Sequence, residues 1–184
     1  MSIMFRIRYA LDSQRLLRDV GPMIPAFWGI ASKSGRASKP IQTSDQIRGN
    51  MLLDTGARHV AIDESVAQEL GLQARPEKED VHGLGGKQSV AVYDATLFLP
   101  VEPVRPVPTA PAGSSFMMSI PIKVHGFVGL QETFQSQGLK PANGLPVIGI
   151  LGRTFLQFTK FTYDGLSGNL LIEIDESVQY PQKS

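Results

Sequence analysis

Short apolar segments, separated by turns that contain glycine and proline, are the feature that most constrains the fold of this chain. Segments such as MFRIRY, PMIPAFWGIA and QIRGNMLLD have the length and pattern of strands. One segment, DESVAQELGL, instead has helical spacing at Val66, Leu70 and Leu72, with Asp63 able to cap it and Gly71 able to end it. Many strands and few helices predict an all-β barrel or sandwich.

Composition excludes several functional classes. The chain has 184 residues, which fits one domain, and 42% of them are hydrophobic, enough for a packed core. The 18 basic residues nearly balance the 17 acidic ones, unlike the basic excess of a dedicated nucleic-acid binder. The absence of cysteine excludes disulfides and cysteine-ligated zinc. No apolar run approaches the roughly 20 residues that span a bilayer. We expect a soluble, cytoplasmic protein with no nucleic-acid or membrane partner.

The stretch MLLDTGA leads from an apolar strand straight into a carboxylate. Asp54-Thr55-Gly56 after a strand is most often a turn, in which the aspartate accepts backbone hydrogen bonds and the glycine takes a positive φ. No other aspartate of the chain is followed by Thr-Gly. Two further features follow in order, a glycine-rich segment, VHGLGGKQSV, and an apolar segment, VIGILGRTFLQF.

These three stretches resemble the retropepsin-like, or retroviral-type, aspartic protease family in its bacterial or cellular branch, from about Pro22 to Asp175. The resemblance implies an all-β, single-lobe acid-protease barrel with one or two short helices. It makes Asp54 the catalytic residue, supported by three neighbours. Thr55 would bridge the two active-site loops with its hydroxyl, Gly56 would let the substrate backbone approach, and Ala57 would complete the loop.

The implied chemistry needs two carboxylates that hold one water molecule. One activates the water as a base, and the other, protonated, polarises the scissile carbonyl. Because the chain has one Asp-Thr-Gly, the second Asp54 has to come from a second subunit. The resemblance therefore implies a symmetric homodimer with the active site on its two-fold axis. We expect an aspartic endopeptidase that acts on peptide or protein substrates without a cofactor.

The glycine-rich segment is expected to form a hairpin. By resemblance, its tip is a mobile flap that closes on the substrate and contains Gly83, Leu84, Gly85 and Gly86. A plain tight turn is the alternative. A phosphate-binding loop is excluded because residue 81 is valine and residue 88 is glutamine.

The later apolar segment offers two alignments to the family's hydrophobic-hydrophobic-glycine motif. One places the motif at 147–149, and the other at 150–152. The second is better, because Gly152-Arg153 then matches the family's Gly-Arg pair. We interpret this pair as structural: Gly152 permits close packing behind the catalytic loop, and Arg153 ties the following short helix to that loop.

Arg58 departs from the family pattern. The retroviral enzymes usually carry an acid at this place, which pairs with the arginine of the Gly-Arg pair and binds substrate backbone. Here Arg58 and Arg153 would repel each other unless Asp63 or Glu64 mediates, and Arg58 would instead favour acidic substrate side chains. The departure motivates an alternative, a catalytically weak or inactive retropepsin-fold module for dimerisation or peptide binding. A monomer in which Asp54 is only a turn residue is a third possibility.

The expected organisation is an N-terminal extension at 1–21, a protease domain at 22–175 with a proline-rich insertion at 100–115, and a tail at 176–184. His59, His82 and His125 lack the i,i+4 spacing of a metal-binding helix, and no cysteine supports them. We therefore predict surface or hairpin histidines and no metal site.

Overall fold

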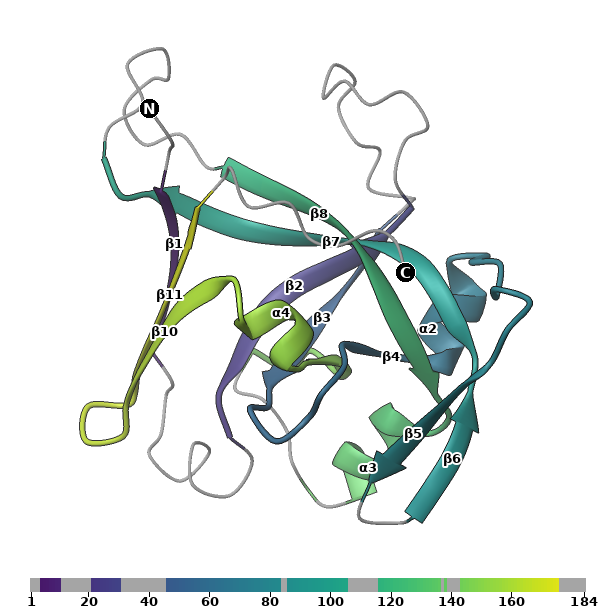
Figure 1. Ribbon diagram of the computed structural model, residues 1–184. Coiled ribbons are helices and arrows are strands. Elements are labelled where there is room, and N and C mark those ends of the chain that lie inside the picture. Colours follow the sequence, from purple (N-terminus) through teal and green to yellow (C-terminus); the bar gives the residue numbers. More distant parts are fainter. Residues whose placement is uncertain are drawn as a thin grey trace.

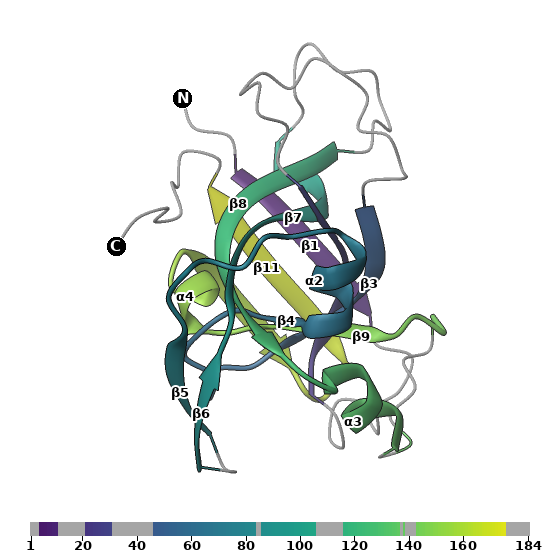
Figure 2. The ribbon, with the colours of Figure 1, turned by 90° about the vertical axis from the view of Figure 1, so that its right-hand side faces the viewer.

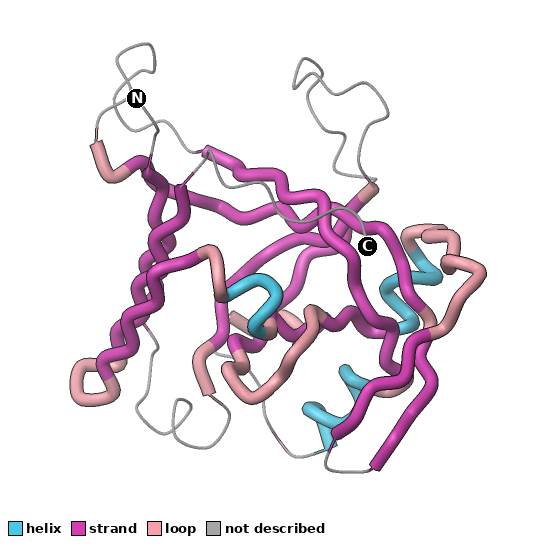
Figure 3. Tube along the Cα trace, in the orientation of Figure 1, coloured by secondary structure: helices cyan, strands magenta, loops and turns pink. Residues whose placement is uncertain are grey.

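The computed structural model describes residues 4–10, 21–30, 46–83, 86–105, 116–136, 138 and 143–175. Strands make up most of the described chain, and the helices are short (Figures 1 and 3). In chain order the elements are β1 Met4–Ala10, β2 Met23–Gly29, β3 Gln46–Leu53, β4 Ala61–Asp63, α2 Glu64–Glu69, β5 Glu79–Gly83, β6 Gly86–Val90, β7 Val92–Pro103, β8 Phe116–Phe127, α3 Leu130–Ser136, β9 Val147–Leu151, α4 Arg153–Leu156, β10 Thr159–Asp164 and β11 Asn169–Asp175.

Six strands close into a barrel. Their order is β7-β2-β3-β9-β4-β8, and pairing between β7 and β8 closes the ring. The pairs β3–β9 and β4–β8 are parallel, whereas the other pairs of the ring are antiparallel. Closure leaves none of these six strands with a bare edge along its whole length. The predicted all-β barrel is therefore confirmed.

Three further strands extend the sheet away from the barrel. β1 pairs with the end of β7 through Phe5 and Arg6, and along its whole length with β11. β10 pairs with β11 and stands at the end of the strand order. Figure 1 shows these three strands as an arm beside the barrel. The first described strand of the chain thus belongs to the same sheet as the last.

Apolar side chains from all parts of the ring meet in one core. Trp28, Met51, Leu97, Ile148 and Phe155 are each 0% exposed. They come from β2, β3, β7, β9 and α4, so strands that are distant in sequence share one buried interior. Burial of this apolar surface is the main force that holds the strand ends in register around the site.

The helix predicted from DESVAQELGL is α2. Asp63 caps it by accepting a hydrogen bond from the backbone N–H of Ser65, and Val66 and Ala67 face the core. Gly71 follows the helix with φ +66°, a conformation that glycine adopts without strain. α2 and α4 cover different sides of the barrel (Figure 2).

Three short helices occur in the described residues, where the sequence predicted one or two. One of the three is α3, which begins after Gly129. Another difference is that residues 100–103, expected within the proline-rich insertion, belong to β7, where Pro100 and Val101 lie opposite Met117 and Phe116. Residues 11–20, 106–115 and 176–184 lie outside the described residues. None of the helices within the described ranges has the length and apolar character to cross a bilayer.

Candidate active site

Two parallel strands bring the two sequence motifs to the same edge of the barrel. Leu53, the last residue of β3, lies opposite Leu151, the last residue of β9. The chain therefore leaves both strands side by side, at Asp54 and at Gly152. The backbone N–H of Asp54 donates to the carbonyl oxygen of Leu151 at 3.1 Å. The alignment of the family motif at 150–152 thus agrees with the position of this segment beside Asp54.

The loop after β3 is a tight turn built on the Asp54 carboxylate. Oδ1 of Asp54 accepts a hydrogen bond from the backbone N–H of Gly56 at 2.7 Å, and the Asp54 carbonyl accepts from Ala57 at 3.2 Å. Asp54 is half-buried, whereas Thr55 and Gly56 are exposed. A Cβ added at Gly56 would lie 3.0 Å from Oδ1, so any larger residue would press on the carboxylate. The turn fixes the orientation of the side chain and presents it at the surface.

Arg153 connects α4 to this loop. Its Nη1 atom donates to the carbonyl oxygen of Thr55 at 2.7 Å and to that of Gly56 at 3.0 Å. Its backbone N–H donates to the carbonyl oxygen of Ala57 at 2.9 Å. The contact between Arg153 and the loop that the sequence suggested is therefore present, and it holds three successive carbonyl groups.

Gly152 lies where the backbones of the two motifs come closest. A Cβ at this position would be 2.2 Å from the carbonyl oxygen of His59 and 2.9 Å from that of Ala57. Both neighbours are backbone atoms, which cannot move aside as a flexible side chain can. Gly152 is therefore needed for close approach, as the sequence predicted, and not for an unusual φ.

Arg58 is exposed, and its carbonyl oxygen accepts from the backbone N–H of Thr154 at 3.0 Å. The two acids suggested as mediators between Arg58 and Arg153 are bound elsewhere. Asp63, only 2% exposed, accepts from the backbone N–H groups of Ser65 and Gln131. Glu64 accepts from the Tyr93 hydroxyl. Nη1 of Arg153 instead donates to the carbonyl oxygens of Thr55 and Gly56.

The glycine-rich segment forms the predicted hairpin. β5 and β6 pair from Glu79 opposite Val90 to Gly83 opposite Gly86, as a sheet of their own. The hairpin projects from the barrel at the same end as α3 (Figures 1 and 2). Leu84 and Gly85, the expected flap tip, lie outside the described residues, so the flap role of residues 83–86 stays a prediction.

The prediction of surface or hairpin histidines is wrong for His125. This residue lies within β8 and is 1% exposed, and its ring centroid is 4.3 Å from that of His59. Val124, the preceding residue of β8, belongs to the core, so His125 lies on the opposite face of the strand, where Glu79 and His59 contact it. His82, in contrast, is exposed on the hairpin.

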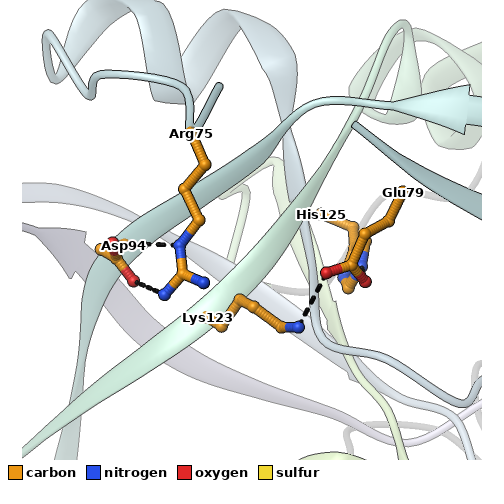
Figure 4. A network of polar contacts seen from close by, with 5 residues as sticks. All are labelled: Arg75, Glu79, Asp94, Lys123 and His125. Carbon is orange, nitrogen blue, oxygen red and sulfur yellow. Dashed lines mark hydrogen bonds and ion pairs between the residues drawn. The ribbon is translucent and has the colours of Figure 1, made fainter. Parts of the chain in front are cut away.

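Sequence reasoning missed a group of charged residues around His125. Glu79 is bound by two residues of β8: Lys123 Nζ lies 2.9 Å from Oε1, and His125 Nε2 lies 2.9 Å from Oε2 (Figure 4). These hydrogen bonds, Lys123 first, lower the pKa of Glu79 to about 2. Burial, followed by the charge of His125, lowers the pKa of His59 to about 4. The available signal was the spacing of Lys123 and His125, which places both on one face of a strand.

Within the described part of the chain, no three histidine or acidic side chains gather as a metal site. Burial, and then the hydrogen bond that the Tyr93 hydroxyl donates to Glu64, raise the pKa of Tyr93 to about 12.

Residues 40–104 match a family model described as aspartyl protease, a family of retropepsin-like aspartyl proteases. No curated protein matches the chain. The matched range contains Asp54, Thr55, Gly56 and the β5–β6 hairpin, and supports a general aspartic protease function. The resemblance is thus confirmed for residues 40–104, which match the model of a retropepsin-like aspartyl protease family, in a chain whose described residues form an all-β barrel.

Proposed function

We propose that the protein is a homodimeric aspartic endopeptidase in which Asp54 of each subunit contributes one carboxylate to a shared active site. The observation that carries this proposal is the placement of Asp54. It follows β3 at the edge where β9 also ends, and its Oδ1 atom is fixed by the Gly56 N–H at 2.7 Å. The match to an aspartyl protease family over the same residues supports it independently.

A second subunit is needed because the acids nearest to Asp54 in the sequence have other partners. Asp63 is buried as the cap of α2 and also accepts from Gln131. Glu64 is bound to Tyr93. With one Asp-Thr-Gly in the chain, a symmetric dimer supplies the second carboxylate from the same position of the partner subunit.

Such a pair performs hydrolysis without a metal. Two carboxyl groups about 3 Å apart do not both ionise, as is established for aspartic protease dyads in general. The ionised one removes a proton from a water molecule held between them, and that water attacks the scissile carbonyl. The protonated one donates a hydrogen bond to the carbonyl oxygen, where negative charge develops. The proton removed from the water then passes to the leaving amine.

The exposure of Thr55 fits this arrangement. Thr55 directly follows Asp54, and Arg153 donates to its carbonyl oxygen. In a dimer, its hydroxyl would donate to the partner loop and keep the two carboxylates in one plane.

Asp54→Asn is the variant that tests this proposal. The amide oxygen of the substituted side chain can still accept from the Gly56 N–H, so the turn is preserved while the proton chemistry is lost. The test combines molecular mass in solution with cleavage of a diverse peptide library from about pH 4 to about pH 7. A dimer whose cleavage falls at least about a hundredfold in Asp54→Asn supports the proposal. A wild-type protein that stays monomeric at high concentration, or equal cleavage by both proteins, would contradict it.

Arg58 favours a second candidate, a retropepsin-fold module that dimerises or binds peptides with little turnover. An exposed arginine stands where the family usually has an acid that helps to anchor substrate backbone. The same experiment separates the two candidates. A dimer that binds library peptides but cleaves none of them supports the binding module.

A further inference from the structure

The β5–β6 hairpin is linked to the barrel by the side chain of its first residue. Glu79 begins β5, and its carboxylate reaches across to β8. Lys123 and His125 bind its two oxygen atoms, each at 2.9 Å. Because these two residues are two apart on one strand, they present their side chains on the same face. Figure 4 shows both beside the Glu79 carboxylate.

In the hydrogen bond between His125 and Glu79, the histidine is the donor. Its side chain is 1% exposed, and the ionised Glu79 carboxylate can only accept a hydrogen bond. The proton between them therefore belongs to Nε2 of His125. Nδ1 of the same ring is buried and has no hydrogen-bond partner among the described residues. Among the described residues, Glu79 is thus the hydrogen-bond partner that orients the ring of His125.

His125 also contacts the segment that carries Asp54. Its backbone N–H donates to the carbonyl oxygen of Val60 at 3.0 Å, and its ring lies 4.3 Å, centroid to centroid, from the ring of His59. The carbonyl oxygen of His59 in turn packs against Gly152. One residue of β8 therefore contacts the base of the hairpin with its side chain and the end of the Asp54 segment with its backbone and ring.

We propose that Glu79 is a positioning residue for peptide cleavage, which fixes the base of the β5–β6 hairpin beside the segment that carries Asp54 by binding Lys123 and His125. The proposal rests on the proposed function, because it assigns a role to the hairpin in substrate binding. Glu79 itself would touch neither the substrate nor the attacking water. It acts by keeping the hairpin in the arrangement in which it can cover a bound peptide.

Loss of a positioning contact has a characteristic effect on the kinetics. If the hairpin spends less time in the binding-competent arrangement, apparent substrate affinity falls in proportion to that fraction. Once the peptide is bound and covered, the chemical step at Asp54 is unchanged. We therefore expect Glu79→Gln to raise KM by up to about tenfold with a much smaller change in kcat.

The hairpin offers a matched control at the next residue. Asp80 is also a carboxylate of β5, but it pairs with Lys87 of β6 at 2.7 Å, within the hairpin and exposed. Asp80→Asn removes the same charge without touching the link to β8. Lys123→Met is the second test variant, since it removes one partner of Glu79 and leaves His125 in place.

The experiment measures kcat, KM and amide hydrogen exchange for the wild-type protein, Glu79→Gln, Lys123→Met and Asp80→Asn. We expect the first two variants to raise KM and to speed exchange in residues 79–90, while exchange in β10 and β11 stays slow. Asp80→Asn should keep the wild-type KM. If Glu79→Gln unfolds the whole protein, Lys123→Met decides.

Two results overturn the proposal. One is a Glu79→Gln or Lys123→Met variant that folds with wild-type KM and wild-type exchange in the hairpin. The other is an Asp80→Asn variant that changes KM and exchange as much as Glu79→Gln does. The effect would then come from the loss of a negative charge on β5 and not from the loss of the contact with β8. If the wild-type protein cleaves no peptide, the proposed function fails and so does the role of Glu79 in cleavage. Hydrogen exchange still decides in that case whether Glu79 anchors the hairpin, so the two failures are distinguishable.

Discussion

The Arg153 guanidinium donates a hydrogen bond to the carbonyl oxygen of Thr55 at 2.7 Å, across 98 residues of sequence. The same Nη1 atom donates to the carbonyl oxygen of Gly56, so the first residue of α4 holds the loop after β3 at two points. In the retroviral enzymes that the sequence resembles, an acid usually pairs with the arginine that corresponds to Arg153. Here backbone carbonyl oxygens take that place, and the arginine stabilises the loop directly.

Removal of this arginine should loosen the loop. We expect Arg153→Met to lower the free energy of unfolding by about 1 kcal/mol, because the lost hydrogen bonds are charged but solvent-exposed. The rate of peptide cleavage should fall by more than this loss of stability alone would cause, since the orientation of Asp54 depends on the same loop. Arg153→Lys should restore part of both, because both bonds come from one nitrogen atom. Urea denaturation and peptide cleavage check this prediction, with the exposed Lys160→Met as control. Equal losses in Arg153→Met and Lys160→Met would contradict it.

Gly152→Ala should destabilise the protein by about 1–3 kcal/mol, since its Cβ would overlap backbone atoms of His59 and Ala57. The matched control is Gly165→Ala, whose Cβ would meet only Tyr163 Cε1 at an ordinary 3.4 Å. Thermal unfolding of both variants provides the comparison. A Gly152→Ala variant as stable as Gly165→Ala would show that the two motifs are not packed as closely as described.

Stability should depend on pH through His59. In the folded protein its pKa is lowered from 6.5 to about 4, chiefly by burial. As pH falls, the unfolded chain therefore binds the proton first, and the free energy of unfolding decreases between 6.5 and about 4. This contribution to stability is complete above that window and lost below it. His59→Gln should remove this part of the pH dependence of the free energy of unfolding. Urea denaturation at a series of pH values between 6.5 and about 4 measures it. The exposed His82→Gln is the control, and an unchanged slope in His59→Gln would contradict the prediction.

The sequence predicted the local features of the fold and the loop around Asp54, but not the contacts between distant strands. Asp63 and Gly71 marked the ends of α2, because caps and stops are local chemistry. The family's Gly-Arg pair led to the prediction that Arg153 contacts the loop after Asp54. The binding of Glu79 by Lys123 and His125 joins residues 44 and 46 positions apart. The spacing of Lys123 and His125 places both on one face of a strand, but it does not identify Glu79 as their partner. The burial of His125 was missed for the same reason, since it depends on Glu79 and His59, which lie far from it in the sequence.

Arg58 should influence which peptides are cleaved. Its charge is exposed next to the Asp54 loop, so acidic side chains near the scissile bond should be favoured. We expect Arg58→Ala to reduce this preference by roughly tenfold or less, and high salt to weaken it in the wild-type protein, because exposed charges are screened. Library profiling of Arg58→Ala against Lys160→Ala tests the prediction. An unchanged acidic preference, or none in the wild-type protein, would show that Arg58 does not select substrates.

In the proposed dimer, two Asp54 side chains from two subunits form one active site. Mixing equal amounts of wild-type and Asp54→Asn protein, under conditions that allow subunits to exchange, tests it most directly. If both carboxylates are needed, only dimers with two wild-type subunits cleave, and activity falls to about a quarter of that of the same total amount of wild-type protein. If each chain acts alone, activity stays at about a half, and that result would contradict the account.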